Sequence, residues 1–83
     1  MMIETQIIET KSDSICFLKK YYRDFKENGD KWENISLENF LKSLVTYTED
    51  IDGYYANINK NELIGKATWR TFADILSGAA VYE

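Results

Sequence analysis

The chain has 83 residues, of which 45% are apolar, and a formal net charge of −4. This length allows one domain, so we expect residues 1–83 to form a single unit, and the acidic balance opposes binding to nucleic acid. No run is long enough to span a bilayer, and the first residues do not resemble a secretory signal. Because Cys16 is the only cysteine, no internal disulfide can form, and we expect a reducing cytoplasm.

The first ten residues are ambiguous. Ile3, Ile7 and Ile8 fit a short helix, but paired β-branched residues also suit an edge strand. A strand over residues 3–8 would make the fold α+β. A single strand has no evident partner in this chain, so we expect a helix.

A helix is predicted from about Ser12 to Asn28, with Ser12 as its N-cap and Asn28-Gly29 as a left-handed stop. Apolar residues recur at spacings of three and four and predict one core-facing side, widened by two further aromatics: Ile15, Leu18, Tyr22 and Phe25, with Phe17 and Tyr21. The opposite side is basic and is expected to face solvent: Lys19, Arg23 and Lys26.

A second helix is predicted to begin after Ser36 as N-cap. Its apolar stripe comprises Leu37, Phe40, Leu41, Leu44, Tyr47, Thr48 and Ile51. Gly53 is a candidate end, but Tyr55 and Ile58 continue the spacing, and one glycine inside a helix costs only about 1 kcal/mol. A loop is expected over residues 57–65, with Leu63 and Ile64 against the core.

A third helix is predicted from Thr68, its N-cap, nearly to the C-terminus. Its stripe is expected to lie in the core: Trp69, Phe72, Ala73, Leu76 and Ala80. The small residues Gly78, Ala79 and Ala80 would let another backbone approach closely. The sequence therefore predicts an all-α, compact three- to four-helix single domain with an aromatic core.

Several of these segments together carry a family resemblance. They are Trp32-Glu33-Asn34 before Leu37-Glu38, Asp52-Gly53-Tyr54-Tyr55, the run Ala67-Thr68-Trp69-Arg70-Thr71-Phe72-Ala73-Asp74-Ile75-Leu76, and the ending Ala79-Ala80-Val81-Tyr82-Glu83. The chain resembles small bacterial proteins of domain-of-unknown-function family 7660 from about residue 12 onward. The resemblance implies no activity, because none is assigned to that family. Small bacterial proteins of this kind often resemble immunity proteins for secreted toxins, which is an analogy of type only.

The combinations of residues that most enzymes use for catalysis are missing from the sequence. The chain has no histidine, which removes the commonest general base and the imidazole ligands of zinc sites. Cys16 is expected to be a buried, inert thiol, and none of the four glycines forms a phosphate-binding loop. We therefore predict no enzyme, no catalytic residue and no cofactor.

The most distinctive polar cluster is Glu49, Asp50 and Asp52, followed by Tyr54 and Tyr55. Carboxylates beside tyrosines form the kind of hot spot that captures Arg or Lys, so we predict partner binding at these five residues. A solvated helix end is the alternative, and core packing is expected to bury one of the two tyrosines. A calcium loop is not predicted, because Thr48 and Asn59 stand at its first and last ligand positions.

Three functions are open at this point. The leading one is a non-enzymatic protein-binding domain, such as an immunity protein or antitoxin-like inhibitor that covers a basic surface of a toxin. The second is a structural module in which Gly78, Ala79 and Ala80 pack across a homodimer. The third, an enzyme that holds a metal with Glu49, Asp50 and Asp52, is the least favoured.

Overall fold

The computed structural model describes residues 5 and 7–82, and its secondary structure is entirely helical there. The helices are α1 (Lys11–Asn28), α2 (Leu37–Asn57) and α3 (Trp69–Val81), with short 3-10 helices η1 (Gly29–Lys31) and η2 (Asn61–Leu63). This confirms the all-α prediction.

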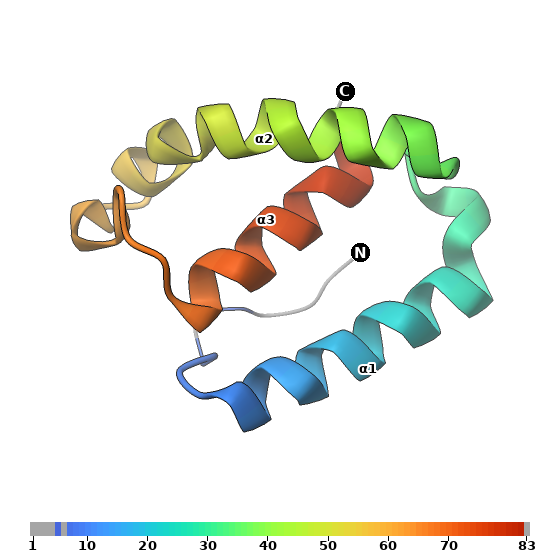
Figure 1. The fold of residues 1–83 in the computed structure, drawn as a ribbon, viewed down its shortest axis with the longest axis horizontal. Coiled ribbons are helices and arrows are strands. Elements are labelled where there is room, and N and C mark those ends of the chain that lie inside the picture. The colour runs from blue at the N-terminus through green and yellow to red at the C-terminus, as the bar shows by residue number, and fades with distance from the viewer. Residues whose placement is uncertain (1–4, 6, 83) are drawn as a thin grey trace.

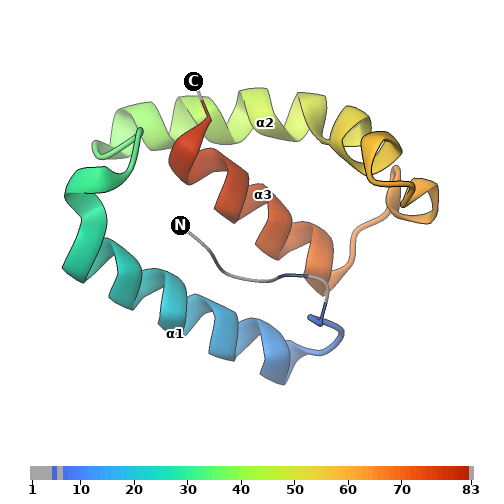
Figure 2. The ribbon, with the colours of Figure 1, turned by 180° about the vertical axis from the view of Figure 1, so that it is seen from behind.

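The three long helices form one layer, with α3 between α1 and α2 (Figures 1 and 2). The molecule measures 34 × 27 × 17 Å. A helix with its side chains is about 10–12 Å across, so the shortest dimension leaves no room for a second helical layer. Each outer helix therefore has a helical neighbour on one side only.

The start of α1 differs from the prediction. Its N-cap is Thr10, whose Oγ1 accepts from the Asp13 amide at 3.1 Å, while Asp13 Oδ2 accepts from the Thr10 amide at 3.2 Å. This reciprocal pair is a capping box, so the predicted N-cap Ser12 lies inside the first turn of α1. The amides of Glu9 and Thr10 lower the pKa of Asp13 by stabilising its carboxylate.

The end of α1 also differs from the prediction. Gly29 has a φ of −59°, within the right-handed helical region, so the chain tightens into η1 instead of making a left-handed stop. A Cβ at Gly29 would lie 3.1 Å from the Phe25 ring, which rests against this glycine.

The other two N-caps are confirmed. Ser36 accepts from the Asn39 amide and Thr68 accepts from the Thr71 amide. Helix α2 continues through Gly53, and Asn59, with a φ of 59°, reverses the chain after it. The Lys60 amide then donates to the Tyr55 carbonyl at 2.8 Å, closing a Schellman motif.

The core differs most from the prediction on α1. The buried cluster is Ile8, Phe17 and Ala73, with Tyr21 and Leu76 packed against it. Four of the six residues predicted to face the core are instead substantially exposed: Ile15 by 42%, Leu18 by 37%, Tyr22 by 65% and Phe25 by 42%. These residues are exposed because the helices form a single layer. Helix α3 covers only the side of α1 that carries Phe17 and Tyr21.

The same effect divides the apolar stripe of α2. Its second half is buried at Ile51 and Tyr55, whereas Leu37 is 71% and Leu41 49% exposed. Of the rest of the predicted stripe, Phe40, Leu44 and Tyr47 are half-buried and Thr48 is exposed, so only part of the stripe lies in the core.

On α3 the small residues form the core. Ala73, Ala79 and Ala80 are fully buried, but Trp69 and Phe72 are each 43% exposed, contrary to the prediction. A Cβ at Gly78 would lie 2.2 Å from Cε2 of Tyr47, so α2 already occupies the space that the small residues leave. The small residues at this end of α3 therefore let α2 of the same chain approach closely.

The segment before α1 is neither helix nor strand where it is described. The Ile8 amide donates to the Thr5 carbonyl in a turn, and Ile8 is 5% exposed. Ile3 lies outside the described residues. Beyond α2, Leu63 is half-buried, but Ile64 is 37% exposed and does not enter the core as predicted.

Candidate functional site

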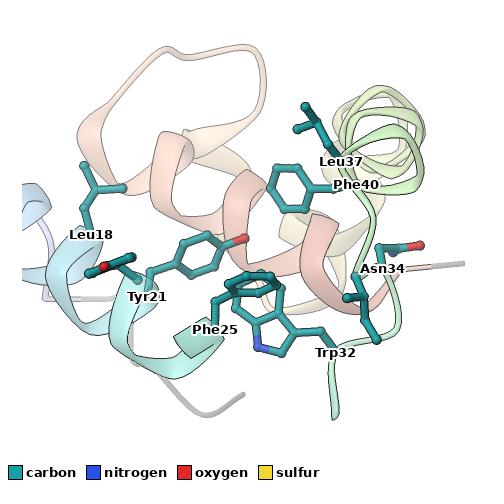
Figure 3. Close-up of a pocket in the computed structure, with 9 residues that line it drawn as sticks. Leu18, Tyr21, Phe25, Trp32, Asn34, Leu37 and Phe40 are labelled. Atoms are coloured by element: carbon teal, nitrogen blue, oxygen red, sulfur yellow. The ribbon is translucent and has the colours of Figure 1, made fainter. Parts of the chain in front are cut away.

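An open cleft of about 400 Å³ lies where the end of α1 and the start of α2 converge (Figure 3). Its walls come from both helices and from the segment that joins them. The lining residues are Leu18, Tyr21, Tyr22, Phe25, Trp32, Asn34, Ile35, Leu37 and Phe40. All except Asn34 are apolar or aromatic.

Trp32 forms the base of this cleft. It is 7% exposed, and its ring lies 4.9 Å from that of Tyr21 and 5.1 Å, edge to face, from that of Phe25. Its Nε1 donates to Asp24 Oδ2 at 2.7 Å. The three rings and this hydrogen bond fix one wall, and Figure 3 shows Phe40 extending from α2 on the other side.

Of the four lining side chains with a hydrogen-bond donor, three donate within the chain. Tyr21 donates its hydroxyl proton to the Leu76 carbonyl at 2.5 Å, and burial raises the pKa of this phenol. Asn34 Nδ2 donates to the carbonyls of Ala79 and Tyr82. With the Trp32 indole also paired, the Tyr22 hydroxyl is the one lining donor to which the structure gives no partner among the described residues.

The predicted acidic cluster does not form one patch. Glu49, Asp50 and Asp52 are all exposed on α2. Successive helical residues are about 100° apart, so Asp50 projects from a different side of α2 than Glu49 and Asp52 do. The three carboxylates therefore do not share one side of the helix.

Asp50 and Tyr54 remain together in a shallow hollow of about 470 Å³ that Tyr47, Gly53, Asn57 and Tyr82 complete. Asp50 accepts a hydrogen bond from the Tyr82 hydroxyl, and this bond raises the pKa of Tyr82. Tyr54 is 38% exposed. These are the predicted residues that the structure does bring together.

Tyr55 is the tyrosine that core packing buries, as one of the pair was expected to be. It is fully buried, and its hydroxyl donates to Asp74 Oδ2 at 2.6 Å. Arg70 Nε lies 3.3 Å from the same oxygen, so the buried carboxylate is paired on two sides. Burial, followed by this hydrogen bond, raises the pKa of Tyr55.

No group of three metal-ligating side chains occurs among residues 5 and 7–82. Cys16, expected to be buried, is exposed on α1. None of the helices in the described part of the chain has both the length and the apolar character of a membrane span.

Comparison with known proteins identifies a family and nothing closer. The model of a family of unknown function, DUF7660, matches residues 10–83. The chain belongs to this family. No curated protein and no solved structure matches it significantly.

In this DUF7660 protein, residues that carry the family resemblance join distant parts of the fold. Trp32 donates to Asp24 near the end of α1, and Asn34 connects the segment between α1 and α2 to the end of α3. Asp74 binds the buried Tyr55. The sequence does not predict the contacts of Trp32 and Asn34, because a Trp or Asn between helices gives no periodic signal.

Proposed function

We propose that this DUF7660 protein is a non-enzymatic protein-binding domain whose cleft receives an apolar segment of a protein chain. The observation that carries the proposal is that most hydrogen-bond donors in the cleft lining already bond to other parts of the same chain. Tyr21, Trp32 and Asn34 use their donors inside the chain, so the lining offers shape and apolar surface but few groups for acid–base chemistry.

The exposure of the lining supports the same proposal. Leu37 is 71%, Tyr22 65% and Ile35 53% exposed, and all three lie on one cleft. Contiguous apolar surface that a folded chain leaves in water is typical of sites that another molecule covers. Aromatic side chains in a pocket are also the usual anchors of protein interfaces.

A role as a toxin inhibitor is a narrower form of this proposal. It rests on the net charge of −4 and on the exposed Asp50 and Tyr54, which share one hollow. In that form the acidic hollow would steer a basic partner, and the apolar cleft would hold it. The single cysteine fits an intracellular, reducing compartment for such a complex.

Site-specific photo-crosslinking in the cell of origin tests the proposal. The photoreactive amino acid benzoylphenylalanine replaces Tyr22 in the cleft, and the matched control replaces the 43% exposed Trp69 on α3, which lines neither the cleft nor the acidic hollow. We expect a discrete protein adduct from position 22 that disappears when Leu37→Lys is added. Adducts that persist in that variant, or that are the same from both positions, contradict the proposal.

A further inference from the structure

The exposed apolar side chains form two stripes that meet at the cleft. On α1 the stripe is Ile15, Leu18, Tyr22 and Phe25, and on α2 it is Leu37, Leu41 and Val45. The cleft lining includes members of both stripes, so both open on the same face of the helical layer. We call this the open face.

Charged residues of opposite sign border the open face. At about 100° per residue, the positions next to the α1 stripe are basic, and the first two positions next to the α2 stripe are acidic. The basic edge is Lys19, Arg23 and Lys26, and the acidic edge is Glu38 and Glu49, with Lys42 beyond them; all six side chains are exposed. Lys26 Nζ lies 5.9 Å from the centre of the Tyr22 ring, which places this cation beside the stripe.

These edge charges are not paired with one another. The ion pair found among the described residues joins Arg70 to Asp74, away from either edge. The layer explains this, because α3 separates α1 from α2 (Figure 1). Opposite charges on the two outer helices therefore lie on opposite borders of the same apolar surface.

We propose, on the basis of the protein-binding function above, that the occupant of the open face is a second copy of this chain. A half-turn about an axis along α3 lays α1 of one copy over α2 of the other. The basic edge of each copy then meets the acidic edge of its partner, and apolar stripe meets apolar stripe. An axis across the helices would instead put basic edge on basic edge.

Two further observations agree with this arrangement. Lys26 is in the last turn of α1 and Glu38 in the first turn of α2, so residues 29–36 hold both at the same end of the layer. A twofold axis along α3 keeps them at that end. The face measures 34 by 27 Å, enough for the roughly 800 Å² per partner that a standard interface buries.

The test is the mass of the full chain in solution over a range of concentrations, by analytical ultracentrifugation. We expect a dimer of twice the 9.7 kDa chain mass, and a monomer for Leu37→Lys with an unchanged circular-dichroism spectrum. A wild-type chain that is monomeric at millimolar concentration overturns the proposal, as does a dimer that Leu37→Lys leaves intact.

Charge reversal tests the relative orientation of the copies. Lys26→Glu and Glu38→Lys should each weaken dimerisation by about tenfold, because the twofold axis repeats every contact, and the double variant should recover most of the loss. Lys20→Glu, on another side of α1, is the matched control and should have a small effect. A double variant that dimerises no better than the single variants overturns the pairing of the basic edge of one copy with the acidic edge of the other.

The crosslinking experiment separates this inference from the function on which it rests. An adduct from position 22 with a different protein, together with a monomeric purified chain, overturns the second copy as occupant and leaves the binding function standing. The absence of both a specific adduct and a dimer overturns the two together.

Discussion

The contact between the second half of α2 and α3 is closed, whereas the cleft between α1 and the first half of α2 is open. Tyr55 is fully buried in the first region and donates to Asp74, and the ring of Tyr47 covers Gly78. In the second region Leu37 is 71% exposed although it lies on the same helix. One helix thus supplies both the core of the domain and its most exposed apolar surface.

The difference shows how a single layer of helices distributes its apolar residues. Helix α3 covers one side of α2 from Tyr55, which bonds Asp74, to Tyr47, where Gly78 allows a close approach. On the side that faces α1, the first half of α2 borders a cleft of about 400 Å³ that Trp32 and Phe25 also line. We infer that the closed contact maintains the fold and the open one is free to bind.

The largest expected effect comes from removing the buried ring of the closed contact. Tyr55→Ala should lower the free energy of unfolding by about 3–5 kcal/mol, because it leaves a cavity and deprives Asp74 of a donor. Tyr54→Ala, at the adjacent and 38% exposed position, is the matched control and should cost less than about 1 kcal/mol. Urea unfolding of the two variants measures the difference. Equal losses would contradict the assignment of Tyr55 to the core.

A smaller effect is expected from adding one methyl group to α3. Gly78→Ala should cost about 1–3 kcal/mol, because the new Cβ would overlap the Tyr47 ring unless α2 and α3 move apart. In α2, a Cβ added to Gly53 would meet no neighbouring atom within 4 Å, so Gly53→Ala should stabilise by about 0.5–1 kcal/mol. Thermal melting of both variants compares them. If both substitutions stabilise the protein, the Tyr47 ring does not lie as close to Gly78 as the structure places it.

Trp69→Ala is expected to cost only about 1–2 kcal/mol, because the side chain is 43% exposed and loses part of its buried area. The apolar spacing of the sequence predicts Trp69 in the core, which would make the loss about 3–5 kcal/mol. The control is Trp32→Ala, which removes a ring that is 7% exposed and should cause the greater loss. A larger loss from Trp69→Ala would reverse the assignment of the two tryptophans.

The smallest effect is expected in alkaline solution. Burial, with the nearby Tyr54 and Asp74 contributing, raises the pKa of Tyr47 from 10.0 to about 12. The folded state therefore holds this proton more tightly than the unfolded state does. The resulting stabilisation is complete below pH 10 and is lost as the pH rises toward 12.

Urea unfolding of wild type and Tyr47→Phe at intervals across this range measures that contribution. The variant has no phenol at this position, so its stability should fall less between pH 10 and pH 12. An identical fall in both proteins would show that the ring of Tyr47 is not buried against α3.

The boundaries of α2 and α3 followed from the sequence because their signals are local. Ser36 and Thr68 each supply a side-chain acceptor for an amide three residues ahead, and that geometry needs no distant contact. At α1 the same kind of signal is present as Thr10-x-x-Asp13, two residues before the predicted cap at Ser12. Local chemistry also left Gly53 inside α2, since a single glycine does not end a helix that has packing beyond it.

Tertiary structure alone decided which apolar residues are buried. Periodicity locates an apolar side of a helix, but it does not say how many neighbours will cover that side. On α1 the side is wide, and one neighbouring helix covers only the part with Phe17 and Tyr21. Leu18, Tyr22 and Phe25 are left to line the cleft, and Trp32 joins them through a hydrogen bond from a segment without periodicity. The candidate site depends on these long-range contacts, whereas the helices that support it follow from caps and spacing in the sequence.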